Sequence, residues 1–215
     1  AIAGGTDLIT ELKKRIRTPQ RLVNLKTIPQ FRFIDFESDN LTIGALTRIT
    51  EVEESPDISN HFPVLSQAAA TVGSPQIRNA ATVGGNLCQS VRCWYYRHPQ
   101  LQCWLKGGKT CYAREGLNRH HAVFGKSPCV AMNPSDLAPA LVALDATAKI
   151  AKADRTHQIP IESLYRLPDA DHRAQTILTP GDIIAEILIP KISKSSRGIY
   201  LKLMERATWS FALVS

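Results

Sequence analysis

Five cysteines lie close together in the sequence, and their thiols have the clearest potential for chemistry. The 215-residue chain has them only at Cys88, Cys93, Cys103, Cys111 and Cys129. An odd number and no other sign of secretion argue against a disulfide framework, and the spacing lacks the Cys-x2-Cys pairs of zinc ribbons. Soft thiolates suit an iron–sulfur cluster or zinc. The pattern therefore favours a metal or cluster site, with disulfides or unlinked thiols as the alternatives.

Two glycine-containing loops have the potential to bind an anion. They are Ala3-Gly4-Gly5-Thr6-Asp7 and Thr82-Val83-Gly84-Gly85-Asn86. Glycine lets the backbone approach a ligand closely, and a helix after the first loop would point its amides at an anion. Neither loop matches G-x-G-x-x-G or the P-loop, and either one alone also fits a tight turn. Together they indicate a diphosphate held between two lobes.

Charge and hydropathy argue against nucleic-acid binding and against a membrane span. The chain has 26 Lys+Arg and 19 Asp+Glu, a net charge of +7, but the basic residues are scattered. The one local run, Lys13-Lys14-Arg15 with Arg17, fits the solvated face of a helix, and no nucleic-acid motif accompanies it. No apolar run approaches the roughly 20 residues of a membrane span. We therefore expect neither nucleic-acid binding nor a membrane span.

The first third of the chain predicts a small βαββ lobe. Leu8, Ile9, Leu12 and Ile16 form one face of a helix that ends at Thr18-Pro19. Short strands are predicted at Arg21–Leu25, Phe31–Phe36 and Leu41–Ile43, with Ser38-Asp39-Asn40 as a hairpin turn. The polar, proline-marked stretch at 51–57 indicates the boundary of this lobe.

The rest of the chain predicts a larger lobe of mixed sheet and helix. A helix is expected from Pro63 to Gly73, and a second over Leu137–Leu144 with Ser135 as its N-cap. The predicted strands are Ala146–Ala153 paired with His157–Ile161, then Ile183–Ile189, then the start of another at Tyr200–Met204. Both ends of the chain are apolar stretches, so we expect it to be cut from a longer protein.

These motifs, taken in order, resemble a known family. The glycine loops, Ile43-Gly44-Ala45, Ile77-Arg78-Asn79-Ala80-Ala81 and Pro134-Ser135-Asp136-Leu137 resemble the FAD-binding medium subunit of molybdenum hydroxylases of the xanthine dehydrogenase group. The resemblance implies an α+β fold of the two-lobed type shared with p-cresol methylhydroxylase. The lobes would be residues 1–54 and 55–192, with 193–215 beginning a C-terminal α/β domain that is truncated here.

The cysteine-rich insert, at about 88–131, narrows the resemblance. It is similar to members such as 4-hydroxybenzoyl-CoA reductase and the periplasmic aldehyde oxidoreductases, whose flavin subunit also holds a [4Fe-4S] cluster. In that pattern the cysteine directly after the Gly-Gly-Asn loop is not a ligand. The implied ligands are Cys93, Cys103, Cys111 and Cys129, with Cys88 beside the flavin. We expect His98, His120 and His121 to be surface or hydrogen-bonding residues, and Trp94, Tyr95, Tyr96 and Trp104 to shield the cluster.

The resemblance also implies a set of flavin contacts. The diphosphate would be cradled by Ile2, Ala3, Gly4, Gly5, Thr6, Asp7 and Leu8, and the second wall would be Ala81, Thr82, Gly85, Asn86 and Cys88. Asp136 would accept from ribose or ribityl hydroxyls, although an acid in the first turn of a helix is the alternative. Ile184 would lie near the adenine, and Lys202 beside the flavin unless it is an exposed strand lysine.

The function implied by the resemblance is electron transfer. Substrate would be oxidised on a molybdopterin-binding large subunit, and electrons would cross [2Fe-2S] centres of a small subunit to the FAD of this chain and then to a soluble acceptor. Such a complex is expected in the cytoplasm, or in the periplasm if exported folded. The alternatives are a zinc-stabilised interaction module without flavin and a self-contained flavin oxidase.

Overall fold

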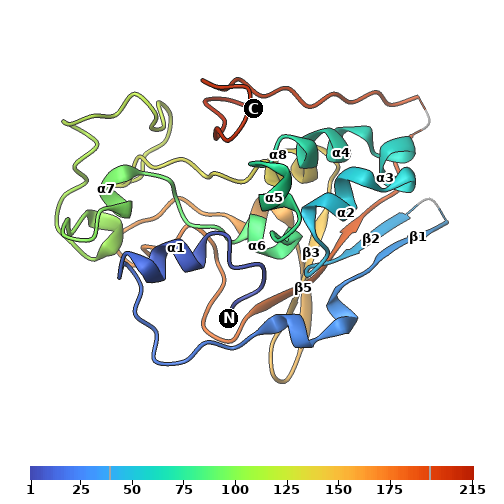
Figure 1. Cartoon of the computed structure of the whole chain (residues 1–215), viewed down its shortest axis with the longest axis horizontal. Coiled ribbons are helices and arrows are strands. Elements are labelled where there is room, and N and C mark those ends of the chain that lie inside the picture. The colour runs from blue at the N-terminus through green and yellow to red at the C-terminus, as the bar shows by residue number, and fades with distance from the viewer. Residues whose placement is uncertain (39, 194) are drawn as a thin grey trace.

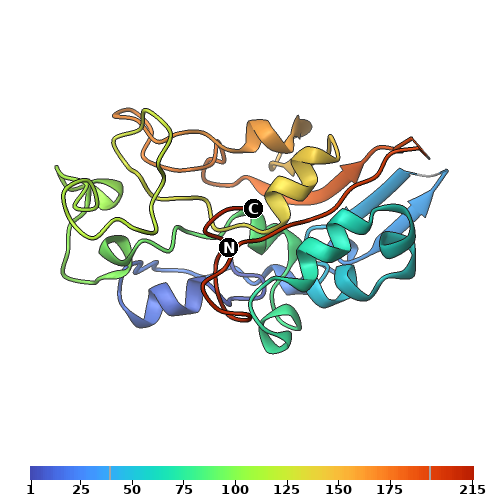
Figure 2. The same ribbon diagram turned by 90° about the horizontal axis from the view of Figure 1, so that it is seen from above.

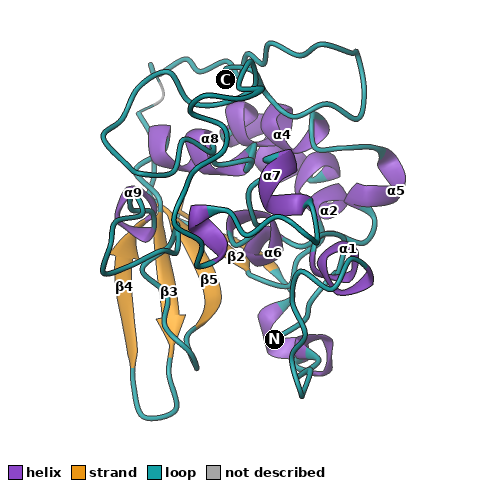
Figure 3. Ribbon diagram, turned by 90° about the vertical axis from the view of Figure 1, so that its left-hand side faces the viewer, coloured by secondary structure: helices purple, strands orange, loops and turns teal. Residues whose placement is uncertain are grey.

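One five-stranded antiparallel sheet organises the chain, with helices gathered on one side of it (Figures 1 and 3). The computed structural model describes residues 1–38, 40–193 and 195–215. In spatial order β1-β2-β5-β3-β4, the strands are β1 (Ile34–Glu37), β2 (Asn40–Gly44), β5 (Ile183–Ile189), β3 (Thr147–Ala151) and β4 (Thr156–Pro160). The predicted α+β class is confirmed.

The central strand β5 shows why this sheet has one dry face. Ile187 pairs with Ile43 of β2 on one side and with Ala148 of β3 on the other, and all three are buried. The opposite face carries polar side chains, such as Lys149 and Glu186, whose Nζ and Oε1 atoms lie 2.9 Å apart. Alternation of this kind is what an antiparallel sheet with one covered face requires.

Short helices cover the dry face of the sheet. They are α2 (Ile49–Glu54), α3 (Pro56–His61), α4 (Pro63–Ala70), α5 (Pro75–Arg78), α6 (Val83–Leu87), α8 (Leu137–Ala143) and α9 (Ile161–Leu164). Proline occupies the first turn of α3, α4 and α5, where its missing N–H costs no hydrogen bond. Among the described residues, none of the helices has both the length and the apolar character needed to cross a membrane.

The cysteine insert lies at the opposite end of the molecule from the β1–β2 hairpin (Figures 1 and 2). It has little regular structure, namely α7 (Trp94–Arg97) and one 3₁₀ turn at Trp104–Lys106. Helix α1 (Leu8–Lys13) runs near it and stops where Arg15 takes a positive φ of 53°. The insert is thus held by side chains rather than by a backbone ladder.

Most predicted elements are confirmed. The structure contains the helix at Leu8, the β1–β2 pair, the helix from Pro63, the β3–β4 pair and β5. Ser135 Oγ accepts from the Ala138 amide (3.1 Å) at the start of α8, as a capping residue does. The predicted turn residue Asp39 lies outside the described residues.

Two local predictions are wrong. Arg21–Leu25 is not a strand, because Leu22 and Val23 have no strand beside them and lie exposed; only Asn24 forms an isolated bridge, with Ile2. Tyr200–Met204 is extended but forms only a Leu203–Val214 bridge, since no sheet edge is next to it. The stretch at 51–57, where the sequence predicts the lobe boundary, contains the end of α2, then Ser55 as the N-cap of α3 and the first residues of α3. Because β2 pairs with β5, residues from both predicted lobes share one sheet, and the division at residue 54 stays a prediction.

Candidate functional site

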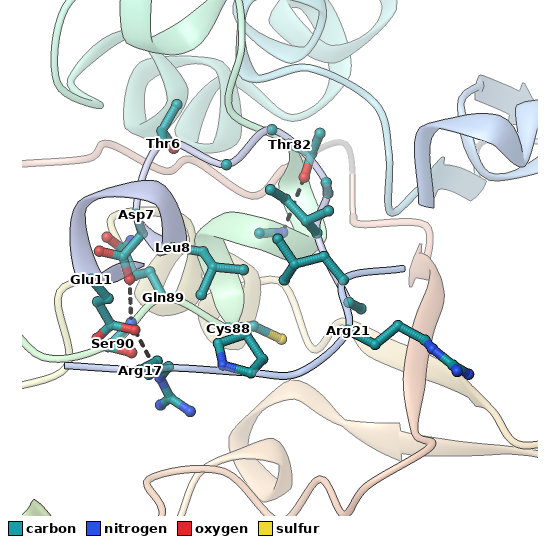
Figure 4. Close-up of a pocket in the computed structure, with 18 of the residues that line it drawn as sticks. Thr6, Asp7, Leu8, Glu11, Arg17, Arg21, Thr82, Cys88, Gln89 and Ser90 are labelled. Carbon is teal, nitrogen blue, oxygen red and sulfur yellow. Dashed lines mark hydrogen bonds and ion pairs between the residues drawn. The ribbon is translucent and has the colours of Figure 1, made fainter. Parts of the chain in front are cut away.

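The two glycine loops meet at one open cavity of about 620 Å³ (Figure 4). Of the predicted flavin contacts, it is lined by Ile2, Ala3, Gly4, Gly5, Thr6, Asp7, Leu8, Thr82, Gly85 and Cys88. Arg17 and Arg21 also line this cavity, which the sequence analysis missed, and Arg17 is paired there with Glu11 at 2.8 Å. Segments about 80 positions apart in the chain therefore form the two walls that the sequence predicts.

Glycine is required where the two loops touch. A Cβ atom on Gly4 would lie 2.1 Å from the carbonyl oxygen of Ala80, so only glycine allows the first loop to pack on the second motif. Gly5 has a φ of +73°, a conformation that glycine adopts without strain. Gly85 differs, because a Cβ there would approach only Thr82 Oγ1 and would otherwise point into open space.

The helices that follow these loops are short. α1 has six residues and α6 has five, so the expected contribution of a helix dipole is small. Thr82 Oγ1 caps α6 by accepting from the Gly85 amide at 3.2 Å. The amides of Val83, Gly84 and Asn86 donate to protein carbonyls as well, so the backbone amides of the first loop, rather than helix dipoles, are the groups suited to an anion here.

A second, smaller cavity of about 280 Å³ continues from the first. The two share Thr6, Asp7, Gly85 and Gln89, and the second adds the predicted contacts Ala81, Asn86 and Asp136 together with Trp209 and Phe211. Asn86 Oδ1 accepts from Ser135 Oγ (2.6 Å) and the Leu137 amide (3.4 Å). Within the described part of the chain its amide nitrogen has no acceptor, which leaves it available to donate to a ligand.

Asp136 and Lys202 form a buried ion pair behind this cavity. Lys202 Nζ lies 2.9 Å from Asp136 Oδ2 and donates to the carbonyl of Thr71, while the Tyr200 hydroxyl donates to Asp136 Oδ1 at 3.2 Å. The Lys202 side chain is 1% exposed, so the alternative of an exposed strand lysine is wrong. Burial raises the pKa of Asp136, and the Lys202 ammonium opposes that rise.

Two predicted flavin residues line neither cavity. The Lys202 ammonium donates to Asp136 and to the Thr71 carbonyl instead. Ile184 is buried in the core opposite Ile150. Their direct contact with a flavin stays a prediction.

The carboxylate of Asp7 ties the first glycine loop to the insert. Oδ2 accepts from the Ser90 amide at 2.8 Å, and Oδ1 lies 2.6 Å from a guanidinium nitrogen of Arg92 and 2.7 Å from one of Arg97. Arg97 in turn donates to the carbonyls of Ser90 and Val91. Nothing in the sequence marks this network, because its members are 83 to 90 positions apart and follow no motif.

The four cysteines predicted as ligands converge on one cavity inside the insert. Cys93, Cys103, Cys111 and Cys129 line it together with Tyr95, Tyr96, Trp104 and His121. All five cysteines are free thiols, so the disulfide alternative finds no support, and Cys88 lies apart in the wall of the first cavity. The free space is about 10 Å³, room for one water, so a bound cluster requires the lining of this cavity to make room for it.

Four thiols are a donor set that fits either an iron–sulfur cluster or a zinc ion. Burial raises the pKa of the Cys93 thiol and raises that of Cys129 to about 11, so a metal centre must displace these protons to bind. Among the described residues, no three His, Cys, Asp or Glu side chains are grouped closely enough to hold a metal ion. A cubane spaces its thiolates further apart than a single zinc ion, which draws four donors to about 2.3 Å.

The histidines and aromatic residues of the insert separate into two groups. Tyr96 and Trp104 are buried beside the cysteines, whereas Trp94 and His98 are exposed. His120 lies 3.6 Å from Glu205. His121 is buried, with its Nε2 atom 3.1 Å from Cys93 Sγ, so it is a hydrogen-bonding histidine as predicted.

Comparison with known proteins gives a consistent family. Residues 1–192 match the family described as the FAD binding domain in molybdopterin dehydrogenase. The chain is similar to the aldehyde oxidoreductase FAD-binding subunit PaoB of Escherichia coli, with 36% identity over all of this chain and 68% of that subunit. It is 26% identical to the nicotinate dehydrogenase FAD-subunit of Eubacterium barkeri, over 99% of this chain and 57% of that one.

A solved structure shares the fold. A chain of the carbon monoxide dehydrogenase of Hydrogenophaga pseudoflava superimposes with a TM-score of 0.71 at 22% identity, covering 98% of this chain and 57% of that one. The chain thus spans between about half and two thirds of the length of these relatives.

The buried Asp136–Lys202 pair generates a prediction about stability. Lys202→Met leaves the carboxylate buried without a cation, so the free energy of unfolding at about pH 7 should fall by about 3–5 kcal/mol. A carboxyl whose pKa is higher in the folded than in the unfolded chain destabilises when ionised. The loss should therefore shrink as the pH falls to about 5. Urea unfolding at both pH values measures it.

Lys149→Met is the matched control, because the Lys149–Glu186 pair has a similar length but is partly exposed. Its loss should stay below about 1 kcal/mol. Equal losses in the two variants, or a loss at Lys202 that does not depend on pH, would contradict the importance given to the buried pair.

Proposed function

The chain belongs to the family of FAD-binding domains in molybdopterin dehydrogenases, and on that premise we propose that it is the electron-transfer subunit of a molybdenum hydroxylase-type complex, holding a FAD and a [4Fe-4S] cluster. The observation that carries this proposal is that residues far apart in the sequence come together at two neighbouring cavities. Two glycine loops line one cavity, four cysteines line another, and residues 88–93 join the two.

The flavin would occupy the two continuous cavities. The amides of residues 3–8 would hold its diphosphate between this loop and Gly85 of the second, with Arg21 in the lining supplying positive charge. The free amide of Asn86 and the second cavity, with Trp209 and Phe211, would hold the ring system. When bound, a flavin exchanges one electron at a time with clusters and two with an acceptor.

The four converging cysteines would hold the cluster. A [4Fe-4S] centre takes four thiolates, and the burial of Tyr96 and Trp104 beside them would exclude water, which sets its potential. A zinc-stabilised module without flavin explains neither the family match nor the cavity between the glycine loops.

The segment from Cys88 to Cys93 would place the two centres next to each other. Cys88, Gln89 and Ser90 line the first cavity, while Val91 and Cys93 line the cysteine cavity. The first half of a single short segment thus faces the proposed flavin and the second half the proposed cluster. This arrangement suits electron exchange between them.

The partners follow from the same proposal. A large subunit would carry molybdopterin and oxidise the substrate, a small subunit would carry [2Fe-2S] centres, and a soluble carrier would accept the electrons. Relatives named as subunits of aldehyde oxidoreductase and nicotinate dehydrogenase support this division. We place the complex in the cytoplasm, or in the periplasm if it is exported folded.

Gly85 provides the test of the flavin site. Gly85→Val adds a branched side chain that projects into the cavity, and such overfilling costs about 1–3 kcal/mol, or roughly a 10- to 100-fold loss of affinity for FAD. Bound flavin is measured by absorbance after gel filtration.

Gly85→Ala should show a weaker effect of the same kind. Gly198→Ala, where a Cβ would make ordinary contact with Val64, is the control and should retain FAD fully. Circular dichroism checks that each variant folds. A folded Gly85→Val protein with stoichiometric flavin would remove the diphosphate assignment.

The fifth cysteine provides the test of the cluster. Each of Cys93→Ala, Cys103→Ala, Cys111→Ala and Cys129→Ala should lose most of its iron, because a cluster with one thiolate missing is labile. Cys88→Ala should keep full iron, since Cys88 lies in the wall of the flavin cavity. Iron and acid-labile sulfide are measured on proteins prepared without oxygen.

Two other patterns of metal content would contradict this proposal. Loss of iron in Cys88→Ala with retention in Cys129→Ala would mean that the ligand set is wrong. Zinc without iron or sulfide in every sample, even after anaerobic reconstitution, would remove the cluster from the proposal.

A further inference from the structure

One imidazole lies against a cysteine of the insert. His121 Nε2 is 3.1 Å from Cys93 Sγ, and the residue is 8% exposed. The backbone fixes its position, because its own amide donates to the carbonyl of Asn118 (2.9 Å) and the next amide donates to Val130 (2.8 Å). The rings of Trp94 and Tyr95 enclose it, with centroids at 5.6 and 6.4 Å.

The location of the imidazole proton follows from the sulfur. A cysteine that ligates iron has no proton, so its sulfur only accepts, and the contact is favourable only if His121 carries its proton on Nε2. Nδ1 is then the unprotonated nitrogen. Nδ1 is buried and has no partner among the described residues, and a buried acceptor without a partner is tolerated better than a buried donor. Both nitrogens thus favour the same tautomer.

An apolar ring would fill this place without leaving a buried polar atom unpaired. His121 instead carries the cost of the orphan Nδ1, and the one polar contact of its ring with the described residues is with Cys93. The neighbouring His120 shows the contrast, since it is half-buried and turned toward Glu205 at 3.6 Å. The polar interaction that distinguishes His121 from an apolar ring is therefore the contact of its Nε2 atom with the Cys93 sulfur.

We propose that His121 is a positioning residue for the cluster, donating a hydrogen bond from Nε2 to the ligating sulfur of Cys93 and thereby making the cluster easier to reduce. The inference rests on the proposed cluster. Reduction adds negative charge that is shared by the sulfurs, and a donor at a sulfur stabilises the more negative state. The hydrogen bond also orients the Cys93 side chain, as outer partners of metal ligands do.

The test replaces the donor and measures the midpoint potential. His121→Phe keeps a ring of similar size without a donor, and His121→Leu gives a second apolar replacement if Phe is not accommodated. Both should hold iron after anaerobic reconstitution and should reduce at a lower potential. The expected change is roughly five- to tenfold in the equilibrium constant for reduction. Redox titration followed by electron paramagnetic resonance measures it on the cofactor-loaded protein.

Two variants complete the design. His121→Gln retains an N–H donor and should recover part of the shift. His120→Phe removes an imidazole from the same loop that faces Glu205 instead of the Cys93 sulfur, and it should leave the potential unchanged. An unchanged potential in iron-loaded His121→Phe or His121→Leu overturns the inference, as does an equal shift in His120→Phe. A wild-type chain that holds no cluster would instead show that the proposed function has failed.

Discussion

The arrangement of both candidate sites depends on one carboxylate, that of Asp7. It lies in the first glycine loop and binds the Ser90 amide and the guanidinium groups of Arg92 and Arg97. A largely buried carboxylate needs such partners, so the loop and the segment leading to Cys93 cannot move independently without breaking charged contacts. This constraint replaces the backbone ladder that the insert lacks, and it fixes the cysteine cavity relative to the cavity between the glycine loops.

Most of the chain's net positive charge lies in the cysteine insert. Residues 88–131 contain seven Lys or Arg and one Asp or Glu, so the insert carries +6 of the chain's net +7. Arg92 and Arg97 neutralise Asp7 from within it, and the remaining basic residues belong to the same insert as the cysteines. An oxidised [4Fe-4S] centre with four thiolates contributes about −2. The basic excess therefore lies where the proposal needs compensation, and a patch for nucleic acid is not required to explain it.

The sequence predicts what depends on short-range pattern. β5 is found at Ile183–Ile189 because an apolar run of strand length has few alternatives, and the glycine loops and cysteines are recognised because residue type alone marks them. It does not predict pairings between distant residues, such as Asp7 with Arg97, Asp136 with Lys202 or His121 with Cys93. The segments at 21–25 and 200–204 have strand-like composition, yet no neighbouring edge is available to pair with them. Local propensity without a partner does not make a strand.

The central claim is that one chain carries two redox centres, a FAD and a [4Fe-4S] cluster, joined by residues 88–93. An anaerobic reductive titration of the purified chain, followed by absorbance and electron paramagnetic resonance, tests this most directly. A FAD takes up two electrons and a [4Fe-4S] cluster one, so the account predicts about three electron equivalents per chain, with both signals changing. Uptake of about two equivalents with only flavin bleaching, or no uptake by a colourless protein, would contradict it.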